Sequence, residues 1–381
     1  MEKRTTGIQK APLVDLFSSV DFPEDMVSLG QGIPFFGPPK EVIDKIAEGI
    51  KRSSAYRYTP DAGVLTLRKK IVQKLFRQHA LSFDPFHQVV VTAGANQAFM
   101  NAILSVTNTG DEIILFRPTY FNYVMGVQLA GCTPIICETD EKFHPRIQDL
   151  QKKLSEKTKA VVTISPNNPT GAVYSADELK KINEFCASHD LFHISDEVYE
   201  YFVYDHVAHK TALIFDDDLD HTISLFSFSK AFGMSGLRVG YMMVPQQIYD
   251  DVLKVQDTIG ICAPAISQMA AEAAIQMDDR YVSRFLPVFQ KNREMIRHLL
   301  SPQSKVKCSM LNGAYYVFLS YNSTLPSWRL TKQLVEGYKV MVLPGSVFDM
   351  EYSLRVSYGN LKTKDFEKGL YRLVDGLNDI L

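Results

Sequence analysis

The stretch Ala160-Val-Val-Thr-Ile164, followed at once by Ser165-Pro-Asn-Asn-Pro-Thr-Gly171, joins a continuous apolar run to a polar turn. A run that is apolar along its whole length is typical of a strand buried on both faces of a parallel sheet. Similar short runs occur on both sides of it in the chain: Val89–Thr92, Glu112–Phe116, Thr133–Cys137, Leu191–Ser195, Thr222–Phe226 and Arg238–Val244.

Stretches with helical spacing separate these runs. Asn96–Val106, Asn122–Ala130 and Ala176–Ser188 are the clearest of them. Strands that alternate with helices in this way favour an α/β fold built on a mostly parallel sheet. We therefore expect a large α/β domain over the middle of the chain.

The two ends of the chain differ from this middle part. The segment up to Pro39 is rich in Gly and Pro and predicts an irregular arm, with Pro39 placed to open a helix. A second amphipathic helix is expected from Leu65 to His79. A long helical region runs from about Pro264 to Leu300, and a final amphipathic helix spans about Lys364–Ile380.

Composition excludes several classes of protein. The chain has 381 residues, with 41 Lys and Arg against 43 Asp and Glu, so it lacks the basic excess of a nucleic-acid binder. No stretch approaches about 18 uninterrupted apolar residues, so no membrane span is expected. The charged start Met1-Glu-Lys-Arg4 has no apolar stretch after it, which argues against a signal peptide.

The cysteines and histidines predict neither disulfides nor a metal site. The five cysteines are scattered, with no C-x-x-C, which is typical of reduced thiols in a cytoplasmic enzyme. None of the nine histidines has the H-E-x-x-H spacing of a metal site. We therefore expect no metal.

Polar segments follow the apolar runs at the points where ligands bind in open α/β sheets, the carboxyl ends of the strands. Ala93-Gly-Ala-Asn96 opens a helix with small residues, which lets backbone N–H groups approach an anion. The other segments supply a lysine, an aspartate, an asparagine, two tyrosines and an arginine: Pro118–Tyr120, Ser165–Gly171, Ser195–Tyr199, and Ser227–Lys230 with Arg238 eight residues on.

This ordered set resembles the class I/II aminotransferases, pyridoxal-phosphate enzymes of fold type I. The resemblance runs from Gly30-Gln-Gly32 to Arg355. It rests on Tyr58-x-x-x-x-Gly, Asn-Pro-Thr-Gly, Asp-x-x-Tyr, Ser-x-Ser-Lys with Arg238, and Leu-Arg-Val-Ser-Tyr. It implies a large domain with a mostly parallel seven-stranded sheet and a smaller α+β domain. We expect residues 1–40 to form the arm and a small-domain segment, 41–283 the cofactor-binding domain and 284–381 the small domain, with the boundary near Tyr281–Arg284.

The resemblance implies pyridoxal phosphate as cofactor and assigns the catalytic residues. Lys230 would bind the cofactor covalently and then carry the proton between the substrate Cα and the cofactor C4′. Asp196 would hold the proton on the pyridine nitrogen, which the electron sink needs. Tyr199 and Asn168 would hydrogen-bond the phenolic oxygen of the cofactor.

The resemblance also assigns the binding residues. Tyr120 would stack on the pyridine ring, where many relatives carry Trp. Arg355 would bind the substrate α-carboxylate as a fork, with the backbone N–H of Gly32 closing over it, and Tyr58 would reach the phosphate in the neighbouring subunit, which implies a homodimer with shared sites. The residues expected to hold the phosphate of the same subunit are Gly94, Ala95, Asn96, Ser227 and Arg238.

The expected activity is a two-step ping-pong exchange of an amino group between an L-amino acid and a 2-oxo acid. One alternative is a lyase of the same fold, such as a carbon–sulfur lyase, or a ring-closing synthase, which would share Lys230, Asp196 and Arg355. A remote alternative is a regulator built on an aminotransferase-like domain. That alternative needs an additional DNA-binding domain, for which the segment before about residue 27 is too short.

The substrate side chain is expected to be neutral. Some dicarboxylate-specific relatives carry a lysine where Asn96 stands, and others carry an arginine in the region of Thr258–Ala265, where this chain has no cation. Phe35, Phe36 and Tyr120 offer apolar surface instead. We therefore expect aromatic amino acids or methionine to be preferred over aspartate, because an unpaired carboxylate is costly to bury.

Overall fold

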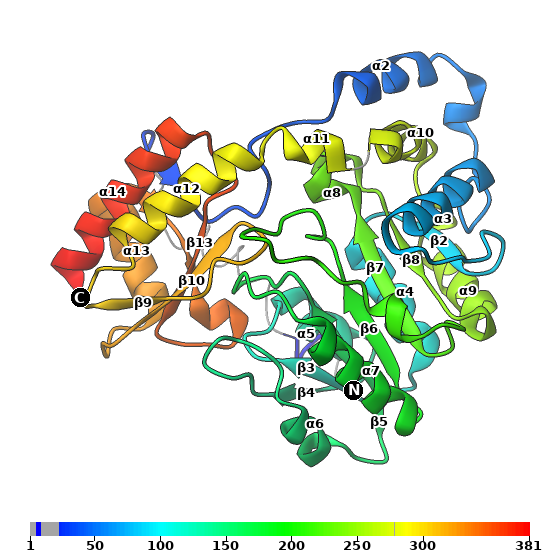
Figure 1. Cartoon of the computed structure of the whole chain (residues 1–381), viewed down its shortest axis with the longest axis horizontal. Helices are drawn as coiled ribbons and strands as arrows, with labels where there is room; N and C mark the ends of the chain where they lie inside the picture. The colour runs from blue at the N-terminus through cyan, green and yellow to red at the C-terminus, as the bar shows by residue number, and fades with distance from the viewer. Residues whose placement is uncertain (1–4, 9–22, 278) are drawn as a thin grey trace.

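The computed structural model describes residues 5–8, 23–277 and 279–381 (Figure 1). Within these ranges its main sheet has seven strands in the order β2-β8-β7-β6-β5-β3-β4, and β8 alone runs antiparallel to its neighbours. This confirms the α/β class. The strands are β2 (Val89–Thr92), β3 (Glu112–Phe116), β4 (Thr133–Cys137), β5 (Thr158–Ile164), β6 (Phe192–Asp196), β7 (Thr222–Ser227) and β8 (Gly240–Met243).

Helices cover both faces of this sheet, which explains why its central strands are buried along nearly their whole length. Along β2, Val90 packs in the cluster that contains α4 and α5, whereas Val89 and Val91 pack in the cluster that contains α3. The helices around the sheet are α2 (Lys40–Gly49), α3 (Leu65–His79), α4 (Ala95–Val106), α5 (Phe121–Leu129), α6 (Ile147–Lys153), α7 (Ala176–Ser188), α8 (Phe228–Ala231), α9 (Tyr249–Gly260) and α10 (Ala265–Ala274).

The start of α7 shows how the sequence sets an element locally. Ser175 accepts a hydrogen bond from the backbone N–H of Glu178, and the Glu178 carboxylate accepts one from the backbone N–H of Ser175. This capping box supplies partners for N–H groups at a helix end that would otherwise have none. It fixes the helix start four residues after the turn that ends at Gly171.

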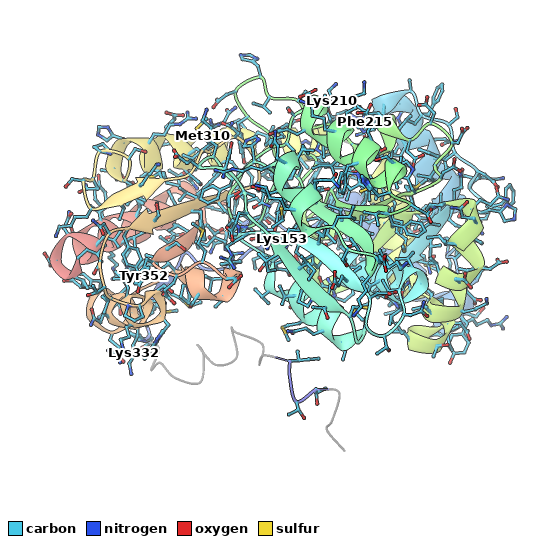
Figure 2. The ribbon with its side chains drawn as sticks, turned by 90° about the horizontal axis from the view of Figure 1, so that it is seen from below. Lys153, Lys210, Phe215, Met310, Lys332 and Tyr352 are labelled. Carbon is cyan, nitrogen blue, oxygen red and sulfur yellow. The ribbon has the colours of Figure 1, made fainter. Side chains whose placement is uncertain are left out.

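The C-terminal part of the chain, residues 286–381, forms a second body beside the main sheet (Figures 1 and 2). In Figure 2, Lys332 and Tyr352 mark this body and Phe215 marks the side of the main sheet. Four of its described strands form an antiparallel sheet in the order β12-β13-β10-β9. Its elements are α12 (Leu286–Leu299), β9 (Val306–Cys308), β10 (Tyr316–Tyr321), α13 (Ser327–Tyr338), β11 (Val340–Met341), β12 (Leu343–Pro344), β13 (Ser353–Ser357) and α14 (Thr363–Ile380).

The arm joins this second body. It contains the short strand β1 (Val27–Ser28), which pairs in parallel with β11. The sequence predicted an irregular segment here, because two residues are too few to give a strand pattern. The proposed domains, residues 1–40, 41–283 and 284–381, stay a prediction.

The helical region expected over Pro264–Leu300 is confirmed, but the prediction of one long helix within it is wrong. The segment is divided among α10, a 3₁₀ turn at Ile275–Met277, α11 (Asp279–Ser283) and α12. Pro287 lies in the first turn of α12, where it needs no N–H partner. Inside a continuous helix the same proline would remove a hydrogen bond and clash with the preceding turn. Among the residues described, no helix is long and apolar enough to cross a membrane.

Candidate active site

A cavity of about 310 Å³ opens where the carboxyl ends of β2, β5, β6 and β7 meet the arm and β13. This volume lies at the small end of the range for ligand pockets. Most of the residues expected from the sequence line it: Gly32, Ala95, Asn96, Tyr120, Asn168, Asp196, Tyr199, Ser227, Lys230, Arg238 and Arg355. The cavity is therefore the candidate active site.

Lys230 lies on α8, the short helix that follows β7, and its amine points into the cavity. Its Nζ donates a hydrogen bond to the carbonyl oxygen of Gly32 at 2.6 Å. Removal from water, followed by the nearby guanidinium of Arg355, lowers the pKa of Lys230 to about 8. A lysine with such a pKa is neutral in a large share of molecules near pH 8 and can act as a nucleophile or base.

Asp196 is the last residue of β6 and is buried. One carboxylate oxygen, Oδ2, accepts a hydrogen bond from the Tyr123 hydroxyl at 2.5 Å, and Oδ1 accepts one from the backbone N–H of Val198 at 3.1 Å. Burial raises the pKa of Asp196 to about 6, although both hydrogen bonds lower it. The carboxylate can hold a cationic ring N–H at neutral pH.

Arg355 on β13 is fixed by contacts on several sides. Its Nη1 donates to Oδ1 of Asn168 at 2.8 Å and its Nη2 donates to the carbonyl of Gly30 at 2.6 Å. Its guanidinium lies 4.4 Å from the centre of the Tyr316 ring. The buried Nε has no partner. Each Nη carries a second N–H beyond these two bonds, so the fork keeps donor capacity for a ligand.

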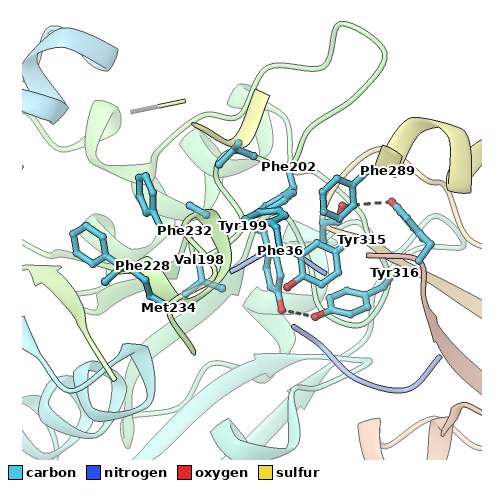
Figure 3. Close-up of a cluster of buried hydrophobic side chains, with 14 of the residues drawn as sticks. Phe36, Val198, Tyr199, Phe202, Phe228, Phe232, Met234, Phe289, Tyr315 and Tyr316 are labelled. Carbon is cyan, nitrogen blue, oxygen red and sulfur yellow. Dashed lines mark hydrogen bonds between the residues drawn. The ribbon is translucent and has the colours of Figure 1, made fainter. Parts of the chain in front are cut away.

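Tyr199 and Tyr316 meet at the floor of the site (Figure 3). Their hydroxyl oxygens lie 2.6 Å apart, and both side chains are buried. Burial raises the pKa of Tyr199 well above its usual value, so its hydroxyl stays protonated and can donate a hydrogen bond.

The opposite end of the cavity is shaped to hold an anion. Gly94 caps α4 with a φ of +86°, and a Cβ at this position would lie only 2.4 Å from Nη2 of Arg238. The Arg238 guanidinium is held there by the carbonyl of Ser235, at 2.9 Å from Nη1. Ser227 and Ser229 add hydroxyl groups to the lining. Helix N–H groups, hydroxyls and a guanidinium together suit a phosphate.

The residues present fit pyridoxal phosphate. The anion end would take the phosphate and Asp196 the ring nitrogen, with Lys230 between them and the Tyr120 ring beside the cavity. Close packing of Gly94 against Arg238 leaves no room for a side chain at the phosphate end. Among the described residues, no group of His, Cys, Asp and Glu side chains could hold a metal ion.

The sequence interpretation missed Tyr123, Tyr316 and Ser235, which also line the cavity. Tyr123 lies three residues after Tyr120 in an aromatic stretch, and nothing in the sequence separates it from a core aromatic residue. Tyr316 lies in an apolar run of β10 and gave no signal.

One expectation about binding residues is wrong, and another stays a prediction. Phe35 and Phe36 do not line the cavity, because they pack among aromatic rings: Phe36 stacks on Phe285 with ring centres 4.1 Å apart. The arm contributes Ile33 instead. Tyr58 is 80% exposed and lies outside the cavity of its own chain, so its predicted role stays a prediction.

The fold and the site together define a transaminase of fold type I. The family model for aminotransferase class I and II matches residues 24–373, and this chain belongs to that family. Its members use pyridoxal phosphate, and the protein is a pyridoxal-phosphate-dependent aminotransferase. The resemblance stated from the sequence is therefore confirmed.

The similar proteins are named for two kinds of substrate, aromatic amino acids and aspartate. The chain is 30% identical to the aromatic aminotransferase ISS1 of Arabidopsis thaliana, over 100% of this chain and 97% of the relative. It is 32% identical to an aspartate aminotransferase of Pyrococcus abyssi, over 96% and 95%. The crystal structure of an aromatic aminotransferase from Pyrococcus horikoshii is similar with a TM-score of 0.88 and 31% identity, over 96% and 99%. These relatives support an aminotransferase and give no support to the lyase alternative.

Proposed function

We propose that this aminotransferase moves the amino group between a bulky, neutral L-amino acid and a 2-oxo acid. The observation that carries the proposal is that every cationic side chain described in the cavity is already needed for the cofactor, the proton transfer or the substrate α-carboxylate. Among the described residues that line the cavity, the cationic side chains are Lys230, Arg238 and Arg355. Each has a task in the reaction, so none is left for a side-chain carboxylate.

The residues would divide the work as follows. When bound, pyridoxal phosphate supplies an electron sink for the negative charge left on the substrate Cα. Lys230 would take the proton from that carbon and return it at C4′, and Asp196 would keep the ring nitrogen protonated. Tyr199 and Asn168 would orient the ring through its phenolic oxygen. Arg355 would hold the α-carboxylate.

The phosphate would be bound by a set of donors on three elements. Gly94, Ala95 and Asn96 lie at the start of α4, Ser227 is the N-cap of α8, and Arg238 follows a 3₁₀ turn. Together these contacts would fix the cofactor against the sheet, and the Arg238 guanidinium would favour the anionic form of its phosphate. Tyr120 would pack against the ring, and Gly32 would close the arm over the substrate.

The cavity wall favours an apolar substrate side chain. Ile33, Phe121, Leu343 and the ring of Tyr120 lie among its lining residues. Burying an apolar side chain against them gains about 25 cal/mol per Å². A carboxylate with no cation partner would lose several kcal/mol, on the order of the penalty for an unpaired buried charge.

We expect phenylalanine, tyrosine, tryptophan or methionine to react with a higher kcat/KM than aspartate. The measurement follows 2-oxo-acid formation from each donor with one common acceptor. A clear preference for aspartate would contradict the proposed substrate class and leave the transaminase assignment unchanged.

We expect covalent capture of pyridoxal phosphate by the apo-protein to depend on pH with a midpoint near 8. Below the pKa of Lys230, about 8, the amine carries a proton and has no free electron pair. The capture rate should therefore rise about tenfold per pH unit below that value and level off above it. Stopped-flow absorbance of the bound cofactor measures it, and a midpoint near 10.5, the ordinary lysine value, would contradict the assignment.

We also propose a homodimer with shared sites, in which Tyr58 reaches the cofactor phosphate of the neighbouring subunit. The support is that Tyr58 is 80% exposed in one chain, and that Ile43 and Ile50 are exposed nearby in the sequence. Large apolar side chains that are exposed in one chain can be buried where two subunits meet.

Mixing two impaired variants should restore activity if the sites are shared. Tyr58→Ala keeps its own Lys230, whereas Lys230→Ala/Arg238→Ala keeps Tyr58. In a mixed dimer, one site then contains every native residue. Free exchange should give about a quarter of wild-type activity, since half of the dimers are mixed and each has one good site.

The controls for this mixing experiment are Tyr56→Ala in place of Tyr58→Ala, and mass spectrometry that confirms subunit exchange. Tyr56→Ala alone should be close to wild type. If exchange is confirmed and mixing gives no gain in activity, the shared-site proposal fails.

We propose a cytoplasmic location, supported by five cysteines that are all free.

A further inference from the structure

Tyr123 contacts the carboxylate of Asp196 from a different element of the fold. It lies on α5, whereas Asp196 ends β6. Its hydroxyl donates to Oδ2 of Asp196 at 2.5 Å, the only side-chain hydrogen bond that the described residues give this carboxylate. The other oxygen, Oδ1, accepts a backbone N–H at 3.1 Å.

The Tyr123 ring is held firmly. It is only 2% exposed. It stacks on Phe99 of α4, with ring centres 3.7 Å apart and planes 19° apart, and it meets the Tyr120 ring edge-on at 5.3 Å. A hydroxyl on a ring packed on two sides can take few other positions, so its direction toward Asp196 is set by the core.

The surroundings of Asp196 make this hydroxyl important. Glu197 follows it directly and disfavours its negative charge, while the amine of Lys230 favours that charge. Tyr120, the residue before α5, also interacts with Asp196. Burial favours the neutral acid. A hydrogen bond donated to the charged form offsets this, and a charge-assisted bond is about twice as strong as a neutral one.

We propose that Tyr123 is a positioning residue that keeps Asp196 ionised and aims its carboxylate at the ring nitrogen of the cofactor. The inference rests on the proposed role of Asp196 and adds a specific donor to it. Tyr123 itself need not touch the reacting atoms. Its effect should appear only where the ring carries a nitrogen that can be protonated.

The test compares two cofactors in the apo-protein: pyridoxal phosphate and its carbocyclic analogue, in which a carbon replaces the ring nitrogen. Tyr123→Phe keeps the ring and removes the hydroxyl. It should weaken the binding of pyridoxal phosphate by about tenfold to a hundredfold, the range for a hydrogen bond to a charged group. Binding of the analogue should stay within about twofold, as expected for a nearly isosteric change.

The pH dependence gives a second readout. In the wild type, the preference for pyridoxal phosphate over the analogue should decline as Asp196 becomes protonated. Loss of the Tyr123 donor raises the pKa of Asp196, so the carboxyl group stays neutral up to a higher pH. The pH at which the preference is half lost should therefore move upward in Tyr123→Phe, and an unchanged midpoint would overturn the inference.

Tyr204→Phe is the matched control. Tyr204 is also 2% exposed, and its hydroxyl donates to the carbonyl of Ala314 at 2.7 Å, so its loss removes one buried hydrogen bond elsewhere. Neither the affinity ratio nor the midpoint should change in this variant. A change equal to that of Tyr123→Phe would show a general effect of core damage and overturn the inference.

Asp196→Asn separates failure of the inference from failure of the proposed function. If Asp196→Asn weakens pyridoxal phosphate selectively and Tyr123→Phe weakens neither cofactor, then Asp196 keeps its proposed role and the inference about Tyr123 is wrong. If Asp196→Asn affects both cofactors equally, the proposed role of Asp196 is wrong, and the inference fails with it. Selective loss in both variants supports both.

Discussion

Replacing Lys230 by alanine is expected to lower kcat on the order of 10⁴-fold, because one amine both binds the cofactor and moves the proton. The side chain projects into the cavity and donates to the carbonyl of Gly32, so its loss removes little packing. The variant should fold and should lose the visible absorption of the covalently bound cofactor. Steady-state assays with a neutral amino acid donor measure the rate.

The control for this prediction is Lys230→Arg. Arginine keeps the positive charge, but it stays protonated at any working pH and cannot act as nucleophile or base. Its activity should be as low as that of Lys230→Ala. Activity within tenfold of wild type in either variant would contradict the role of Lys230. Thermal unfolding of both variants should show the wild-type fold.

Replacing Arg355 by lysine is expected to lower kcat/KM for an amino acid by about 30-fold to several thousand-fold, the range for loss of a buried hydrogen-bonded charge pair. Arg355 is 4% exposed and is aligned by Asn168, Gly30 and the ring of Tyr316. An ammonium group keeps the charge but cannot offer two parallel N–H groups to a carboxylate.

A donor without the α-carboxylate provides the control. Phenethylamine has the ring and the amine of phenylalanine but no carboxylate for Arg355 to hold. It should be a poor donor for the wild type, and Arg355→Lys should change its kcat/KM little. If the variant loses as much with phenethylamine as with phenylalanine, Arg355 acts on the fold or the cofactor and the assignment to the α-carboxylate is wrong.

Much of the fold could be predicted because buried strands and amphipathic helices leave strong patterns. Glu112–Phe116, Thr133–Cys137 and Leu65–His79 have the same bounds in the structure as in the sequence prediction. The division of the helical region Pro264–Leu300 into separate helices was missed, because the apolar spacing continues across Pro287 and spacing alone does not show where a helix must restart.

The site residues that could be predicted from the sequence are those at the carboxyl ends of buried strands, where ligands bind in open α/β sheets. Lys230 and Asp196 lie at such ends, and both reach the cavity. The sequence did not distinguish Tyr123 and Tyr316 from core aromatic residues. Their hydroxyl groups act in the site only because they hydrogen-bond to residues distant in sequence, Asp196 and Tyr199. Phe36 was misplaced for the related reason that an apolar side chain beside a glycine-rich arm fits a substrate pocket and a core equally well.

The most direct test of the account is to map the lysine that carries the cofactor. The protein with bound pyridoxal phosphate is treated with borohydride, digested, and examined by mass spectrometry. The account predicts a pyridoxyl group on the peptide that contains Lys230, and its loss when the protein is first incubated with phenylalanine, because the released amine leaves no covalent link to reduce. A stable label on another lysine, such as Lys74, or no label on any lysine, would contradict it.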